Sequence, residues 1–279
     1  MNGVHTFHHL AKPAVDEEEV WSSEILPILL GLPSNVIDIW HYCVTEMVNN
    51  AIDHSGGQTI TVAIERMADH TKVLVADDGV GIFKKIHAAL GLVDEQHAIL
   101  ELSKGKLTTD PSRHSGQGIF FTSRMLDDFW IFSGGLVFSH KHDRPIDFLS
   151  EDDDPTSSTM VTMALSNSAD RTLKDVFGQF ESGEDLDFSR TVLPVRLAKF
   201  QDGKLVSRSA AKQLVARIDQ FKTVMFDFAS VETVGQAFLD EIFRVWAASH
   251  PEVDCYVMGE SPEILRLLAQ IQTPENVYI

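Results

Sequence analysis

The sequence predicts an α/β protein of two domains, and three observations lead to this fold class. The chain has 279 residues, which suits one large or two ordinary domains, and 44% of them are hydrophobic, which is enough for packed cores. Helical and strand-like patterns alternate along the chain. An acidic segment almost without apolar residues, at 181–187, has the composition of a linker. We therefore expect domains at 1–180 and 188–279.

The charge and the apolar runs restrict the partners of the chain. The 41 acidic and 23 basic residues give a formal net charge of −18, which repels polyanions, so no direct nucleic-acid partner is expected. The longest apolar run, residues 25–32, is far shorter than the roughly 20 residues of a membrane span, and residues 1–13 lack a signal-peptide pattern. No membrane partner is therefore expected. Two isolated cysteines, Cys43 and Cys255, fit a reducing compartment, so we expect a cytoplasmic protein.

The first domain is expected to have its core at about 20–165. Its expected elements are, in chain order, a helix that begins in the acidic segment 15–32, a long helix within 32–54, strands at 59–67 and 71–79, short helical pieces within 83–115, a helix at 116–126, a hairpin at 128–142 and a strand at 158–166. Gly134 and Gly135 supply the turn of the hairpin, because such turns need positive backbone angles.

The long helix has an apolar stripe and a polar stripe. At about 100° per residue, the apolar stripe consists of Trp40, Val44, Met47 and Ala51. The polar stripe lies about a third of a turn away and consists of Glu46, Asn49, Asn50 and Asp53. A solvated helix face has such a stripe. A hard-cation site has one too, because Asn offers Mg²⁺ a neutral oxygen and a Glu one turn earlier can orient or deprotonate a water.

Two glycine motifs help to decide between these readings. ADDGVGIF follows the second strand at residues 76–83, and HSGQGIFF occupies residues 114–121. A single Gly-x-Gly is weak, since glycines occur in any turn. Two of them, on either side of a helical insert and preceded by E-x-x-x-N on a helix, resemble the ATP-binding fold of the GHKL family, which includes histidine kinases and anti-sigma-factor kinases. The resemblance covers about 20–165 and implies a GHKL (Bergerat) α/β sandwich with a mixed or antiparallel sheet.

The resemblance implies a role for individual residues. Glu46 corresponds to the family's catalytic or water-orienting carboxylate, and Asn50 to its Mg²⁺ ligand. Asp77 corresponds to the aspartate that accepts the adenine amino group, because the family's order is aspartate, one polar residue and then glycine. The other nucleotide-binding positions are the turn beside the base, Gly79 and Gly81, the second glycine box, Gly116 and Gly118, and the threonine that supports the adenine aspartate, Thr159.

These roles also suit the chemistry of each residue. A carboxylate at the end of a strand is a fixed acceptor for the exocyclic N–H₂ of adenine. Backbone N–H groups at a helix N-terminus receive phosphates, and glycine lets the backbone come close. Residues 83–115 correspond to the ATP lid, which contains Lys104 and Lys106. Two readings of these lysines stay open, namely that they neutralise triphosphate charge or that they are solvated.

The expected second domain alternates strands and helices. Strands are expected at 191–200, 222–229 and 253–260, and helices at 207–221, 235–250 and 262–272. Residues 222–248 resemble the STAS-like domains that follow GHKL domains in bacterial signalling proteins. Related anti-sigma-factor antagonists carry a phosphorylatable serine at the start of a helix, and Ala237 stands at that position. Ser230 and Thr233 lie nearby and have the pattern of turn or helix-capping residues.

The two resemblances together imply a function. They indicate a bacterial signalling or regulatory protein with ATP and Mg²⁺ as cofactors, in which the nucleotide state of a GHKL domain controls a STAS-like interaction domain, with slow ATP hydrolysis. The alternative is an anti-sigma-type protein serine/threonine kinase that acts on a partner protein. A regulatory protein partner is expected under both hypotheses, and a homodimer stays open. Label from ATP on protein or in free phosphate discriminates between the two.

Overall fold

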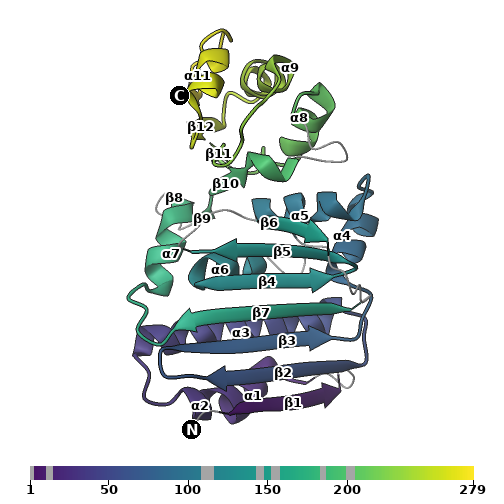
Figure 1. Cartoon of the computed structure of the whole chain (residues 1–279), viewed down its shortest axis with the longest axis vertical. Helices are drawn as coiled ribbons and strands as arrows, with labels where there is room; N and C mark the ends of the chain where they lie inside the picture. Colours follow the sequence, from purple (N-terminus) through teal and green to yellow (C-terminus); the bar gives the residue numbers. More distant parts are fainter. Residues whose placement is uncertain are drawn as a thin grey trace. The chain divides into compact units, whose positions relative to one another are not determined.

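The computed structural model describes residues 3–10, 15–107, 116–142, 148–151, 158–182, 187–198 and 205–279. Within it the chain forms two compact units (Figure 1). The first unit comprises Met1–Leu102 and Lys106–Val176, and the second comprises Ser103–Gly105 and Phe177–Ile279. Each unit combines helices with its own sheet, so the expected two-domain α/β fold class is confirmed. Parts of the expected lid and linker, residues 108–115 and 183–186, lie outside the described residues.

The first unit contains a seven-stranded sheet in the order β1-β2-β3-β7-β4-β5-β6. Every neighbouring pair of its strands is antiparallel, as the GHKL resemblance implies. The strands are β1 Val4–Leu10, β2 Thr59–Arg66, β3 His70–Asp77, β4 Asp128–Ser133, β5 Leu136–Lys141, β6 Phe148–Glu151 and β7 Thr159–Ser166. The hairpin of β4 and β5 turns at Gly134 and Gly135, as expected. The edge strand β1 was not expected from the sequence.

Eight helical elements occur among the described residues up to residue 180. They are α1 Glu17–Val20, the π-helical turn η1 Trp21–Ile25, α2 Leu26–Leu29, α3 Ser34–His54, α4 Ile82–Leu90, α5 Glu95–Lys104, α6 Gly118–Met125 and α7 Leu173–Phe180. The long helix α3 contacts β2, β3 and α6, and α6 contacts β4 and β5 (Figure 1). The expected apolar stripe of α3 is buried in this layer, since Trp40, Val44, Met47 and Ala51 are at most 5% exposed. The polar stripe therefore points away from the core.

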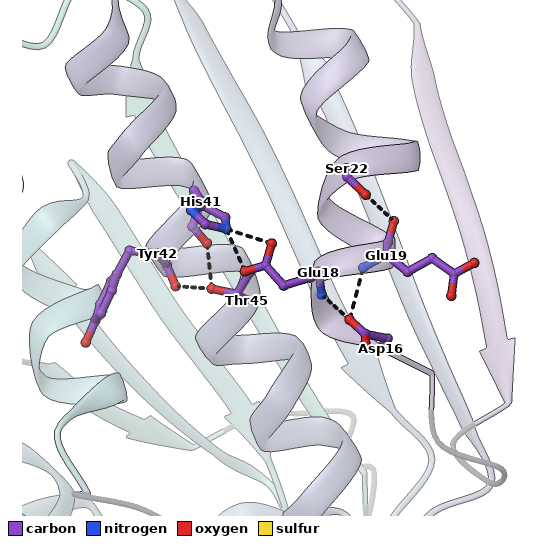
Figure 2. Close-up of polar contacts among 7 residues, drawn as sticks. All are labelled: Asp16, Glu18, Glu19, Ser22, His41, Tyr42 and Thr45. Atoms are coloured by element: carbon purple, nitrogen blue, oxygen red, sulfur yellow. Dashed lines mark hydrogen bonds and ion pairs between the residues drawn. The ribbon is translucent and has the colours of Figure 1, made fainter.

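Polar contacts attach the N-terminal helices to α3 (Figure 2). Asp16 caps α1, because its Oδ1 accepts hydrogen bonds from the backbone N–H groups of Glu18 and Glu19 at 2.8 and 3.2 Å. Glu18 then pairs with His41 of α3, with 2.8 Å between Oε1 and Nε2. Thr45 Oγ1, one turn further along, donates to the carbonyl of His41 at 2.7 Å. The Glu18–His41 pair therefore joins α1 to α3 close to the start of the polar stripe, while the other bonds are internal to one helix each.

The second unit contains a parallel sheet in the order β10-β11-β12-β13. Its elements are a small antiparallel pair, β8 Glu181–Ser182 and β9 Asp187–Phe188, then β10 Arg190–Pro194, the 3₁₀ turn η2 Val195–Ala198, α8 Arg208–Leu214, β11 Thr223–Asp227, α9 Gln236–Asp240, the π-helical turn η3 Glu241–Trp246, α10 Ala247–Ser249, β12 Asp254–Met258, α11 Pro262–Leu268 and β13 Val277–Tyr278.

The alternation of strands and helices expected for this region is present, but several bounds differ, and the helix expected at 207–221 ends at Leu214. The first strand ends at Pro194 rather than near residue 200, because proline has no N–H to continue the ladder. The chain also adds β13, a short edge strand that pairs with β12. Among the described residues of the whole chain, no helix is long and apolar enough to cross a membrane.

Candidate functional site

The first unit contains a cavity of about 280 Å³ beside the polar stripe of α3. This volume is close to the lower end of the range for small-molecule sites, about 300–1,000 Å³. Predicted site residues from four separate parts of the sequence line this cavity, namely Glu46, Asn50, Asp77, Gly81, Gly116, Gly118 and Thr159. Helix α3 supplies the first two, and the end of β3, the start of β7 and the starts of α4 and α6 supply or adjoin the others.

Asp77 is the last residue of β3 and is held on both sides by paired strands. It lies opposite Ile60 of β2 and Thr159 of β7. Its Oδ1 accepts a hydrogen bond from the backbone N–H of Gly79 at 2.9 Å, which is how Gly79 contributes to the site. Burial raises the pKa of this carboxyl, and backbone hydrogen bonds from Gly79 and Thr159 oppose the rise. Asp77 is thus a fixed, partly buried acceptor on the cavity wall.

The neighbouring Asp78 has a different task. Its Oδ1 accepts hydrogen bonds from the backbone N–H groups of Gln58 and Thr59 at 2.7 and 2.9 Å, and its Oδ2 accepts one from Thr59 Oγ1 at 2.8 Å. These bonds lower the pKa of the exposed Asp78 carboxyl. They fasten the start of β2 to the turn after β3, so of the two adjacent aspartates it is Asp77 that faces the cavity.

Thr159 connects the strand that supports Asp77 with the helix after the first glycine motif. Its hydroxyl oxygen accepts a hydrogen bond from the backbone N–H of Ile82 at 3.0 Å, and Ile82 is the first residue of α4. Thr159 is buried, with 8% of the residue exposed. A hydroxyl at this position therefore caps α4 from outside the helix.

Glu46 and the second glycine motif meet at one point. Gly118 is the first residue of α6, and a Cβ added there would overlap Oε2 of Glu46. The carboxylate consequently lies beside the N-terminal turn of α6, where the backbone N–H groups have no partners within the helix. Gly116, two residues earlier, has φ +71° and accepts a hydrogen bond from the N–H of Leu107 at 3.0 Å.

Sequence reasoning missed one charged residue of the cavity wall, Lys85 of α4. Its Nζ donates a hydrogen bond of 2.7 Å to the carbonyl of His54, the last residue of α3. Burial lowers the pKa of Lys85, and the nearby carboxylates of Asp53 and Asp77 raise it. The signal for it was available, since it lies in the first turn after Gly81 and a cation there is well placed for a charged ligand.

Lys104, in the expected lid, neither faces the cavity, where it could neutralise triphosphate charge, nor lies in solvent. Its side chain is buried, with 1% of the residue exposed, and its Nζ donates to the carbonyls of Gln213 and Ala216 at 3.1 and 2.8 Å. It is therefore not solvated, and its ammonium is directed to carbonyls of the second unit to which Ser103–Gly105 belongs.

The donor chemistry at the cavity suits a magnesium ion that arrives with a ligand. Asn50 offers an amide oxygen, and Glu46 offers a carboxylate one turn away on the same helix. Among the described residues, no group of three or more His, Cys, Asp or Glu side chains forms a cage for a metal. Mg²⁺ usually takes one or two protein oxygens and completes its shell with water and phosphate oxygens. Asn50 fits this pattern.

Two family models match the chain. Residues 21–136 match the model of the histidine kinase-like ATPase domain, and residues 210–257 match the model of a STAS-like domain of unknown function (DUF4325). The chain carries a histidine kinase-like ATPase domain followed by a STAS-like domain. A comparison with curated proteins finds no match. The match to the ATPase domain includes every predicted site residue except Thr159, which follows it in the chain.

The sequence resemblance to anti-sigma-factor antagonists assigns their phosphorylatable serine to position 237, which is an alanine here. Ala237 is exposed in the first turn of α9, directly after Gly235 and Gln236. Ser230 is exposed in the preceding loop with φ +62°, and Thr233 is also exposed there. The match to the STAS-like model spans α8 to β12, so it includes this loop.

Proposed function

We propose that the histidine kinase-like ATPase domain binds ATP with Mg²⁺ in the 280 Å³ cavity, and that its nucleotide state controls the STAS-like domain. Slow ATP hydrolysis then resets the protein, which acts in bacterial signalling or regulation in the cytoplasm. The observation that carries the proposal is that Glu46, Asp77 and Gly118, chosen from three separate motifs, line one cavity. Binding of one shared ligand accounts for the presence of all three motifs at the same cavity.

The proposed roles follow from the chemistry of each group. The carboxylate of Asp77 accepts the adenine N–H₂, and the backbone N–H groups after Gly116 and Gly118 receive phosphate oxygens. Asn50 holds the Mg²⁺ ion, which when bound neutralises phosphate charge. Glu46, beside the start of α6, orients or deprotonates the attacking group. Lys85 adds a positive charge to the cavity wall of an otherwise acidic protein.

In this proposal the STAS-like domain is an interaction module for a protein partner. Ala237 cannot accept a phosphoryl group, which argues against a kinase that modifies its own second domain. The attacking group positioned by Glu46 is then a water for an ATPase. It is a hydroxyl of a partner if the protein is instead a serine/threonine kinase.

Incubation of the full chain with γ-labelled ATP and Mg²⁺ tests the proposal. We expect label in free phosphate, with release about 10²–10⁴-fold slower in Glu46→Ala. The exposed Asp78→Asn variant is the control, because Asp78 binds Thr59 and does not line the cavity. Label on an added partner protein would instead support the kinase. Absence of nucleotide binding by calorimetry in the wild-type chain would reject both.

A further inference from the structure

A short piece of the expected lid belongs to the second unit. Ser103–Gly105 groups with residues 177–279, although α5, which ends at Lys104, begins at Glu95. Ser103 and Lys104 are 2% and 1% exposed. Lysine is almost never fully buried unless its charge has partners. This burial therefore points to a specific attachment rather than to chance packing.

The attachment of Lys104 uses both its side chain and its backbone. Its Nζ donates to the carbonyls of Gln213 and Ala216 at 3.1 and 2.8 Å. Gln213 lies in the last turn of α8 and Ala216 two residues beyond its end, and carbonyls at the C-terminal end of a helix attract a positive charge. Thr191 Oγ1, in β10, donates to the carbonyl of Lys104 at 2.7 Å, and Thr191 is 0% exposed. Sheet and helix of the second unit thus hold the same residue.

The chain path from Lys104 to the cavity is short. Leu102 and Leu107, on either side of Ser103–Gly105 in the chain, both line the cavity of the first unit. The two residues after Lys104 have positive φ values of 80° and 54°, so the backbone turns sharply there. Leu107 then donates its N–H to the carbonyl of Gly116 at 3.0 Å, and a Cβ at residue 116 would overlap the backbone of Leu107.

We propose that Lys104 is a positioning residue that couples nucleotide binding in the cavity to helix α8 of the second unit. The inference rests on the proposed nucleotide site. Phosphates that bind at Gly116 and Gly118 displace or stiffen the backbone of Leu107. Because Leu107 is only three residues from Lys104, the backbone of Lys104 and its hydrogen bonds to the carbonyl acceptors then change as well. Coupling between sites is reciprocal, so loss of the Lys104 attachment also changes the affinity for nucleotide.

The test uses the full chain and a non-hydrolysable ATP analogue with Mg²⁺. In the wild type, the analogue should change hydrogen exchange of the amides at 208–216. Lys104→Met keeps the length of the side chain but removes its charge and donors, so this change should disappear and Kd should shift about fivefold or more. Lys212→Met is the matched control on α8, because the Lys212 side chain is 69% exposed. It should keep both the exchange change and the wild-type Kd.

A second pair of variants keeps the inference testable if Lys104→Met does not fold. Thr191→Val removes the hydroxyl that donates to Lys104, whereas Thr191→Ser retains it. We expect the Val variant to lose the exchange change at 208–216 and the Ser variant to keep it. The inference is overturned if the wild type binds the analogue with unchanged exchange there, or if Thr191→Val keeps the change. Failure of the wild type to bind at all overturns the proposed function as well, so the two failures are distinguishable.

Discussion

The carboxylate of Glu46 fills the space that a side chain at Gly118 would need. A Cβ at residue 118 would overlap Oε2 of Glu46, so only glycine is compatible with the observed position of the carboxylate. Glu46 belongs to α3 and Gly118 begins α6. The relationship therefore locks the polar stripe of one helix to the first residue of another, and both line the cavity.

This relationship predicts how substitutions at the two positions combine. Gly118→Ala alone should displace the Glu46 carboxylate, and because this is the end of a flexible side chain, the expected destabilisation of the folded state is at the low end of the overpacking range, about 1 kcal/mol. In a chain that also carries Glu46→Ala, the destabilisation by Gly118→Ala should fall to a few tenths of a kcal/mol. In a chain with Glu46→Gln, which keeps the side-chain volume, most of the destabilisation should remain. Urea unfolding of the single and double variants measures these values. Equal costs of Gly118→Ala in all three backgrounds would contradict the contact.

Glu46 and Asn50 should separate turnover from binding. If Glu46 orients or activates the attacking group, Glu46→Ala should lower turnover about 10²–10⁴-fold with nearly intact affinity for ATP. Asn50→Ala should instead weaken binding measured with Mg²⁺ and have little effect on binding measured with EDTA. Calorimetry and phosphate release in both variants provide the comparison. An equal loss of affinity in the two would mean that Glu46 has a structural role.

The two adjacent aspartates should differ sharply in nucleotide affinity. Asp77→Asn presents a donor where the adenine N–H₂ needs an acceptor, and a mispaired buried group costs about 1–3 kcal/mol. The expected loss in Kd is therefore about 5- to 150-fold. Asp78→Asn should bind ATP like the wild type, because the Asp78 side chain accepts bonds from Gln58 and Thr59 outside the cavity wall. Calorimetry with ATP and with GTP tests both variants. Similar affinities of the two variants would remove the assignment of the adenine site.

Asp77 should also make the ligand-free protein less stable at neutral pH than in mild acid. Burial raises its pKa in the folded state, so the folded state holds the proton more tightly than the unfolded state. The contribution of Asp77 to the free energy of unfolding must then fall as pH rises from the ordinary aspartate pKa through the folded-state pKa. Asp77→Asn lacks this titration. Urea unfolding measures the difference in the free energy of unfolding between the variant and the wild type. This difference should shift in favour of the variant as pH rises across that interval. A difference that does not depend on pH would contradict the raised pKa of Asp77.

Much of the cavity could be predicted because helical periodicity and short motifs are local. The 3.6-residue repeat of α3 fixes which side chains share a face, so the buried stripe from Trp40 to Ala51 and the polar stripe with Glu46 follow from the sequence alone. The glycine motifs are also local, and they mark the starts of α4 and α6. What such patterns cannot provide is the partner that each group meets across the fold.

Lys104 and β1 are two examples of that limit. Lys104 lies in polar sequence, which leaves open a role in neutralising triphosphate charge or a solvated side chain, yet its acceptors are carbonyls of Gln213 and Ala216 more than a hundred residues later. Strand β1 is rich in histidine and has no clear apolar alternation. It is a strand because its backbone pairs with β2 from Val4 to Leu10, and His8 Nδ1 is 3.0 Å from Thr61 Oγ1 across that pair. Both outcomes depend on long-range pairing rather than on local pattern.

The position of Asp77 has a consequence for chemical probes of the protein. It lies where three adjoining strands are paired, with Ile60 and Thr159 on either side, whereas the phosphates of the proposed nucleotide would lie at Gly116, which is bonded to Leu107. If the proposed function is right, we expect a heteroaromatic fragment with one N–H donor to engage only the sheet end. Its binding would be insensitive to substitutions at Lys104 or Thr191, whereas that of a triphosphate would not. Fragment screening against these variants would thus yield inhibitors that occupy the site without operating the switch.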